Sequence, residues 1–319
     1  MKRISEAQLI SALLLTEGFA LLCITGSVSL TTLAGYLAAA VIHAAAALLL
    51  IRCRRPYGTV CRCGLLLCLL IQGGQSAGLL HGISGELGIP AGGVTVSLLT
   101  ALVCIYAVSS GTGALSRAAA AAACAGAFCL AAVTLTELFS AGREDWAMLA
   151  DIPAALSLRE ELIRGLAAGT GTGVFAVLNC PASGGRVRLW AAGRSVLVLA
   201  VFMTIMLSAG GIMPIVSHPA AAAARIIQPF TSQRIDALFM AVVSVSAVFS
   251  LSIQSACVAE LLGSLLPELP AKSMIATAAV MLTGALSAAL PEGFYAAVSL
   301  LPLLLPAVTA SVRRLSRPF

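Results

Sequence analysis

The chain has 319 residues, of which 60% are hydrophobic and only 10% are charged, and its net charge is +6. Soluble domains average roughly 45–50% apolar and about 25% charged residues. A water-soluble domain could not bury so many apolar side chains, so the composition favours an all-α membrane protein with several spans. The modest positive charge gives no reason to expect a nucleic-acid partner.

Ten apolar runs are long enough to cross a bilayer as helices, which takes roughly 17–25 residues for each crossing. They lie near 8–26, 32–51, 64–82, 91–109, 118–139, 160–180, 190–212, 235–257, 272–290 and 293–312. The third and the sixth are the weakest, because glycines and polar residues interrupt them. The chain is therefore expected to lie in the lipid bilayer as a single permease-like domain of about ten helices.

The first run contains an ionisable residue followed by a glycine, Glu17 and Gly18, near its middle. A charged group at that depth is costly in lipid and marks a functional candidate. The alternative is a hydrogen-bonded glutamate that joins two helices. Because a glycine follows the glutamate, we also expect this helix to be discontinuous, with free backbone groups facing a ligand.

The third run carries two glutamines, Gln72 and Gln75, spaced three residues apart. This spacing places both side chains on the same face of a helix. They are candidates for lining a polar interior with Glu17. The alternative is that they only bond to neighbouring helices.

The sixth run opens with "SLRE", residues 157–160, which is a capping-box pattern typical of a helix start. It then reaches "GTGTG", residues 169–173, where each glycine costs roughly 1 kcal/mol relative to alanine in a helix interior. The pattern indicates a helix break with a ligand near the backbone, or a close helix contact through the GxxxG spacing. The residues expected to bind a solute here are Gly169, Thr170, Gly171, Thr172 and Gly173.

The eighth run begins after "TSQRIDALFM", residues 231–240, which contains Arg234 and Asp236. Asp236 falls in the first helical turn, where an acidic side chain favours the helix dipole. Arg234 can extend to the lipid headgroups. The alternative is that one of the two contacts the first or sixth helix, as part of a gate or a contact with a partner subunit.

Basic residues in the connections predict the orientation. If the N-terminus is cytoplasmic, the cytoplasmic segments hold fourteen of the nineteen basic residues: Lys2, Arg3, Arg52, Arg54, Arg55, Arg62, Arg117, Arg186, Arg188, Arg194, Lys272, Arg313, Arg314 and Arg317. An excess of Lys and Arg inside sets membrane orientation. We therefore expect both termini to lie in the cytoplasm.

A long polar connection, near 140–159, divides the runs into five and five. Because five is odd, the second half enters the membrane from the opposite side. The expectation is a five-plus-five inverted repeat of the LeuT-like kind, with halves at 1–140 and 155–319, and with solute bound near the bilayer midplane between discontinuous first and sixth helices.

Two stretches resemble the endospore germination permeases, the B subunits of GerA-type germinant receptors. "QPFTSQRIDALFMAVVSVSAVFSLSIQ", residues 228–254, is similar to that family's eighth helix and its entry, and "ISEAQLISALLLTEGFALL", residues 4–22, is similar to its N-terminus. The loop "SSGTGALSR", residues 109–117, sits where that family has a comparable glycine-containing turn. The resemblance implies membership of the amino acid–polyamine–organocation superfamily and a location in a bacterial inner membrane or the spore inner membrane. It also implies a small germinant such as an amino acid, and partner subunits of the A and C types.

The chain departs from that family by being shorter, rich in alanine and glycine and poor in aromatics, with threonines in the sixth helix where relatives often carry a carboxylate. An ordinary secondary transporter of amino acids or small metabolites, including the drug/metabolite exporter type, is therefore the alternative function. No catalytic cluster or HExxH motif predicts an enzyme, and the pattern implies no cofactor. Cys53, Cys61 and Cys63 lack a second ligand pair, so no metal site is expected.

Overall fold

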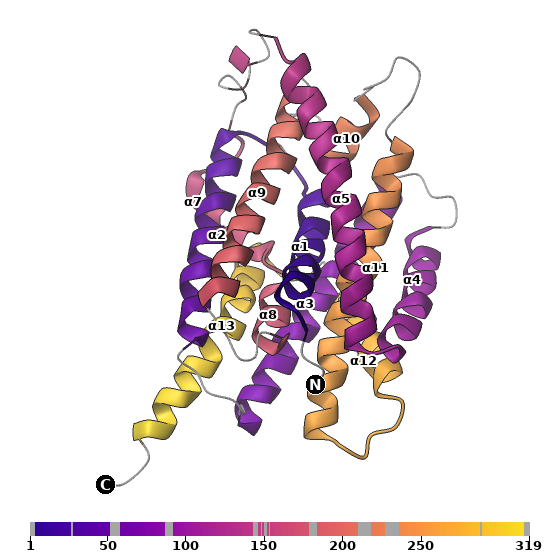
Figure 1. Ribbon diagram of the computed structural model, residues 1–319, viewed down its shortest axis with the longest axis vertical. Helices are drawn as coiled ribbons and strands as arrows, with labels where there is room; N and C mark the ends of the chain where they lie inside the picture. Colours follow the sequence, from indigo (N-terminus) through magenta and orange to yellow (C-terminus); the bar gives the residue numbers. More distant parts are fainter. Residues whose placement is uncertain are drawn as a thin grey trace.

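A computed structural model of the chain describes residues 4–26, 28–51, 58–86, 92–142, 146–147, 149, 152, 154–178, 184–209, 218–226, 236–287 and 289–315. Within these residues the regular structure is helical (Figure 1). The helices are α1 Glu6–Leu22, α2 Leu30–Leu50, α3 Thr59–Glu86, α4 Gly92–Ser109, α5 Thr112–Ser140, α7 Leu158–Ala167, α8 Thr172–Leu178, α9 Gly184–Ala209, α10 Pro219–Ile226, α11 Asp236–Leu265, α12 Lys272–Ser287 and α13 Glu292–Leu315.

Every predicted run coincides with a helix of the structure, the sixth run with the pair α7 and α8. Six described helices are long and apolar enough to cross a membrane: α2, α3, α5, α9, α11 and α13. Two more apolar helices, α4 and α12, are shorter. The chain is thus a helical protein suited to a membrane.

Capping residues stabilise the N-termini of several of these helices. Ser5, Ser29 and Ser157 each form a capping box, in which the serine side chain accepts from the backbone of the third helical residue. Gly111 lies between α4 and α5 with φ of 87°, a conformation that glycine adopts without strain. This glycine allows a tight turn between two long helices.

The first helix is continuous, contrary to the expected interruption at Glu17 and Gly18. Residues Glu6–Leu22 form one α-helix, and Gly18 packs against Leu197 of α9. Glutamate is a good helix former, and one glycine costs only about 1 kcal/mol. The helix continues because neighbouring side chains, described below, satisfy the Glu17 carboxylate without any unwinding of the backbone.

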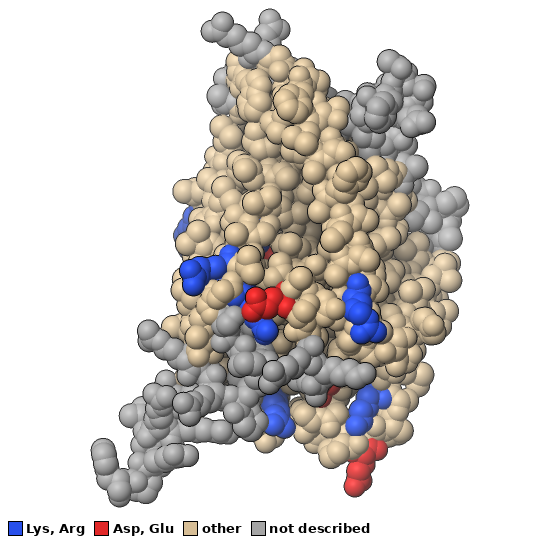
Figure 2. Space-filling model, in the orientation of Figure 1, with Lys and Arg blue, Asp and Glu red and all other residues tan. Residues whose placement is uncertain are grey.

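The buried core surrounds α1, α3, α8, α9 and α11, with large fully buried side chains such as Phe19, Leu69, Phe175 and Phe202. The outer helices instead expose apolar residues, for example Leu102 on α4. In Figure 2, charged side chains of the described residues lie in the middle and lower parts of the visible face, beneath a broad uncharged surface. Such a surface suits lipid tails.

Helix contacts in the first half of the chain are repeated in the second half, when α7 and α8 are taken together as the sixth segment. Helix α1 contacts α5 and α9, and correspondingly α7 contacts α13 and α2. Helix α3 contacts α4, α12 and α13, while α11 contacts α12, α4 and α5. If the ten segments are numbered in chain order, these contacts of a segment in the first half match the contacts of the segment five places later.

Candidate functional site

The sixth segment is broken, which is one of the two interpretations of its glycines. Helix α7 ends at Ala167 and α8 begins at Thr172. Around the break the backbone hydrogen bonds span fewer residues than in an α-helix. The N–H of Gly169 donates to the carbonyl of Leu166, three residues earlier, at 2.9 Å. A broken helix leaves backbone groups in need of partners within the protein interior.

Both glutamines of α3 supply such partners. The Gln72 side chain donates to the Thr172 hydroxyl at 2.8 Å and accepts from the Gly173 backbone N–H at 3.1 Å. The Gln75 side chain donates to the Ala167 carbonyl at 3.1 Å. These two residues therefore hold the two sides of the break from one face of α3.

Helices α11 and α1 complete the contacts of the break. The Gln254 amide donates to the Thr170 carbonyl at 3.3 Å and to the Ser76 hydroxyl at 3.2 Å. The Thr170 hydroxyl donates to the Thr16 carbonyl at 3.3 Å. Side chains or backbone from three other helices thus converge on residues 167–173.

Next to the break lies a buried ion pair. A carboxylate oxygen of Glu17 is 3.3 Å from the guanidinium of Arg194 in α9, and its other oxygen accepts from the Trp190 indole N–H at 3.3 Å. The side chains of the pair are 2% and 3% exposed. Two charges can remain in such an interior only because each neutralises the other and is hydrogen-bonded.

Arg194 also ties α9 to α2 and α7. Its guanidinium donates to Nδ1 of His43 at 2.7 Å and to the Gly165 carbonyl at 3.1 Å. Arginine can only donate, so Nδ1 of His43 is the acceptor and Nε2 carries the ring proton. Nε2 lies 2.9 Å from the Ser299 hydroxyl, which in turn donates to the Ala296 carbonyl at 2.8 Å.

The three glycines have no side chain, which lets Glu17, His43 and Gln72 approach the backbone of the break closely. A Cβ at Gly171 would lie 3.2 Å from Oε1 of Glu17, and one at Gly169 would overlap the His43 ring. A Cβ at Gly173 would lie 2.6 Å from the Gln72 side-chain oxygen. The helix is thus broken, and its glycines also permit close contacts between helices.

Some buried polar atoms of α11 have no hydrogen-bond partner within the described part of the chain. They are the side-chain oxygen of Gln254 and the hydroxyl group of Ser255. Buried polar groups are rarely left without a partner, and each such group calls for an explanation. The Gln254 oxygen belongs to the same amide that contacts the break.

A second charged cluster lies one turn before the break. Arg164 of α7 pairs with Glu161 at 3.6 Å and with Glu292 at the start of α13 at 3.4 Å, and it donates to the Thr25 carbonyl. The Thr32 hydroxyl of α2 donates to Glu161 at 2.8 Å. Arg164 thereby links α7 to α13 and to the connection between α1 and α2.

Most of the predicted site residues meet in the structure. Glu17, Gln72, Gln75 and residues 169–173 form one contact network, whereas Gly18 faces α9 instead of the break. Asp236 is the first residue of α11, as expected, while Arg234 lies outside the described residues. The proposed gate or partner contact of these two residues stays a prediction.

Five residues of the network were not predicted as site residues: Arg194, His43, Trp190, Ser299 and Gln254. Arg194 was assigned to a cytoplasmic connection, but it is buried within α9. The signal was present, because Arg194 and His43 are ionisable residues within or beside apolar runs, the criterion that identified Glu17. Ser299 and Gln254 carried no comparable signal.

The arrangement brings a carboxylate, a guanidinium group and the backbone polar groups of the break together in one buried place. The Glu17 carboxylate can pair with a cationic group, and the Arg194 guanidinium can pair with an anionic one. Comparison with known proteins adds no relative: no family model matches the chain, and no curated protein matches it.

Proposed function

We propose that this chain is a membrane permease-type protein that binds a small solute at the break between α7 and α8. The observation that carries the proposal is the broken helix, whose freed backbone groups contact α1, α3 and α11 beside the buried Glu17–Arg194 pair. Solute sites of membrane transporters are typically formed by such discontinuous helices near the bilayer midplane.

The repeated helix contacts support a five-plus-five inverted repeat with halves at 1–140 and 155–319. Segments five places apart have corresponding neighbours. Five crossings reverse the direction of the chain, so equivalent helices of the two halves run in opposite directions. In this architecture α1 and the α7–α8 segment are equivalent, and they contact each other at the centre of the bundle.

A zwitterionic amino acid matches the charges of the site. Its carboxylate can replace Glu17 as a partner of Arg194, and its ammonium group can replace Arg194 as a partner of Glu17. Both protein charges then stay neutralised, which a solute with a single charge does not achieve. Because the pair is almost fully buried, the solute reaches it only when helices separate, so binding favours a different packing of the same helices.

For the physiological role, we propose a germinant-receptor B subunit that acts with A- and C-type subunits. The support is the resemblance of residues 4–22 and 228–254 to the germination permeases. The alternative role is an ordinary secondary transporter of amino acids or small metabolites, which would use the same solute site. The two roles differ in the neighbouring genes, because a transporter needs no genes for A- and C-type subunits beside its own.

The test is germination of spores that lack the gene, measured against a panel of amino acids, sugars and nucleosides. We expect loss of the response to one amino acid, with recovery on re-expression of the wild-type chain. Glu17→Gln should not restore the response at an equal protein level. Arg188→Gln, which changes an exposed arginine on the same helix as Arg194, should restore it fully.

Normal germination on the whole panel would overturn the receptor proposal. Uptake of the same solutes into vesicles containing the wild-type chain would then test the transporter. Uptake that Glu17→Gln leaves unchanged would also remove Glu17 from the solute site.

A further inference from the structure

Helix α13 contains two prolines, Pro302 and Pro306, within Glu292–Leu315. Because proline has no backbone N–H, the carbonyl groups four residues earlier, of Val298 and of Pro302 itself, lose their usual donors in the helix. Sharp bends in helices almost always occur at prolines or similar interruptions. The middle of α13 is therefore the place where this helix bends most easily.

The half of α13 before the prolines is tied to the surroundings of the break. The Gln72 amide, which holds the start of α8, also donates to the freed Val298 carbonyl at 3.4 Å. The Ser299 hydroxyl accepts from the His43 ring at 2.9 Å. Side chains of α2 and α3 thus hold this half in place, and one of them replaces the donor that a proline removes.

The half after the prolines, residues 303–315, begins along α3. Figure 1 shows that the last turns of α13, in yellow, extend away from the other helices. Two contacts define how α13 and α3 lie: Gln72 bonds to Val298, and Gly64 lies against Leu305, whose side chain would overlap a Cβ at the glycine. Residue numbers fall along α3 as they rise along α13, so the two helices run antiparallel in contact.

The face of α3 beneath this contact leads to the break. Cys61, Gly64, Cys68 and Gln72 are spaced three and four residues apart, so they share one side of the helix. Cys61 and Cys68 are only 1% and 5% exposed, although the neighbouring Cys63 is exposed. This face runs from the first turn of α3 to the glutamine that holds the break. The second half of α13 therefore covers a route from the end of the bundle to the broken helix.

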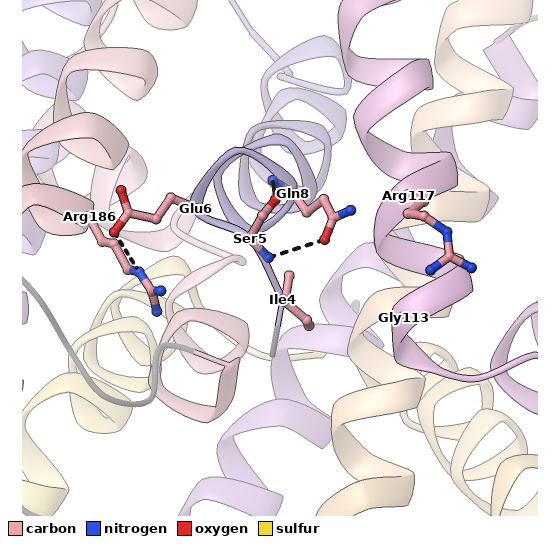
Figure 3. A pocket seen from close by; sticks show the side chains of 7 residues that line it. All are labelled: Ile4, Ser5, Glu6, Gln8, Gly113, Arg117 and Arg186. Atoms are coloured by element: carbon pink, nitrogen blue, oxygen red, sulfur yellow. Dashed lines mark hydrogen bonds and ion pairs between the residues drawn. The ribbon is translucent and has the colours of Figure 1, made fainter. Parts of the chain in front are cut away.

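Polar contacts hold the starts of α1 and α9 together. Around a pocket at the first turn of α1, Glu6 pairs with Arg186 of α9 at 3.2 Å, and Ser5 bonds to Gln8 within the turn (Figure 3). The contact of Leu305 with α3 is apolar instead. Apolar side chains gain little by leaving lipid for protein, because lipid tails are equally apolar. Separation at this contact breaks no polar bond and costs mainly the loss of close packing.

We propose that residues 303–315 form a lid, which swings about Pro302 and Pro306 and opens the broken helix to the side of the membrane on which α13 ends. The half of α13 before the prolines stays bonded to α2 and α3 during this motion. Hinged elements of this kind control access to binding sites in many proteins. That the lid admits a solute rests on the proposed function, whereas the hinge itself does not.

Native cysteines report the opening of the lid without any solute. The purified full chain in phosphatidylcholine nanodiscs is pulsed with N-ethylmaleimide, unfolded, and treated with an isotopically heavy form of the same reagent. Peptide mass spectrometry then gives the fraction of each cysteine that reacted during the pulse. We expect Cys68 to react more slowly than the exposed Cys63, but faster than Cys23 and Cys257, which are fully buried in other helices.

Two variants weaken the closed contact in different ways. Gly64→Ala adds a methyl group that displaces Leu305, and Leu305→Ala removes the side chain that covers the glycine. Each should speed the labelling of Cys68 at least about fivefold, the lower end of a typical shift between two conformations. Gly126→Ala adds the same methyl group to open space on α5, and it should leave the rate unchanged.

Pro302→Ala combined with Pro306→Ala restores both backbone donors, so it should slow the labelling of Cys68 at least about fivefold. An unchanged rate in this variant would overturn the hinge. The lid would also be excluded if Cys68 reacted as slowly as Cys257 in every variant, or as fast as Cys63 in the wild type. Equal acceleration of Cys68 and Cys257 would indicate a general loosening and count against it as well. Because no solute is added, failure of the lid would leave the proposed function standing, and a missing response to solutes would not change these rates.

Discussion

Glu17 and Arg194 depend on each other inside the bundle. Arg194 has three acceptors, in Glu17, His43 and Gly165, whereas Glu17 has two donors, in Arg194 and Trp190. The indole of Trp190 also stacks on Phe175 of α8, with ring centroids 4.6 Å apart. Removing one charge therefore leaves the other buried without its partner and disturbs the contacts of the broken helix.

We predict that Glu17→Gln and Arg194→Met each destabilise the folded chain by about 3–5 kcal/mol, the usual cost of breaking a buried ion pair. Arg194→Met should be the more harmful, since it also removes the donors to His43 and Gly165. The double variant should be more stable than the sum of the two effects predicts, by roughly 0.5–3 kcal/mol, because the residues are in direct contact. Thermal unfolding in detergent, with Arg188→Gln as the exposed control, measures all three, and purely additive effects would mean that the pair contributes no coupling.

At the level of single residues the sequence predicts one member of the buried ion pair. An ionisable residue in an apolar run is visible without a structure, and so Glu17 was found. Its partner was missed because Arg194 lies only a few residues inside the run near 190–212, where it looks like one of the basic residues that flank a span. Ser299 and Gln254 are small or neutral polar residues, and only their positions in the packed bundle distinguish them from others of their type.

Among the helices, the sixth segment departs most from regular structure, and its Gly173 is packed far more closely than Gly126 of α5. Gly173 lies against Gln72 and Leu69 of α3, and an added Cβ there would be 2.8 Å from the Leu69 side chain. Gly126 in the middle of α5 has open space around it. The same substitution should therefore have opposite effects at these two positions.

We predict that Gly173→Ala lowers stability by about 1–3 kcal/mol, the usual cost of adding a methyl group to a packed interior. It should also displace the Gln72 amide that holds the start of α8. Gly126→Ala should raise stability by up to about 1 kcal/mol, since alanine favours a helix and meets no neighbour. Thermal unfolding of both variants beside wild type provides the measurement, and stabilisation by Gly173→Ala would show that the close packing at the break does not hold.

The helices themselves were largely predictable, because hydrophobic length and capping residues are local properties. The pattern "SLRE" gives the start of α7, and the three glycines give its end. The false break in α1 shows the limit of this reasoning. A glutamate followed by a glycine resembles an interruption only when the compensating arginine, 177 residues further along the chain, is unknown.

For the whole molecule, the loop charges predict the orientation in the membrane, and the repeated helix contacts predict the number of spans in each half. The excess of basic residues in the expected cytoplasmic connections predicts that both termini are cytoplasmic, and the burial of Arg194 removes only one residue from that excess. The repeated contacts support five crossings in each half. An odd number of crossings in each half would place the connection after α5 on the side opposite to both termini. Orientation and span number can therefore be tested together.

We predict opposite locations for reporters fused after Ala141 and after Phe319. Alkaline phosphatase, which is active only outside the cytoplasm, should be active after Ala141 and inactive after Phe319, and a green fluorescent reporter should show the reverse. A fusion after Ser110, in the turn between α4 and α5, is the internal control and should behave like the C-terminal fusion. If the reporters after Ala141 and Phe319 lay on the same side, the second half would cross the membrane an even number of times, and an inverted repeat would be impossible. If all three locations were reversed, the five-plus-five count would hold, and the excess of basic residues would lie outside, against the rule that orients most membrane proteins.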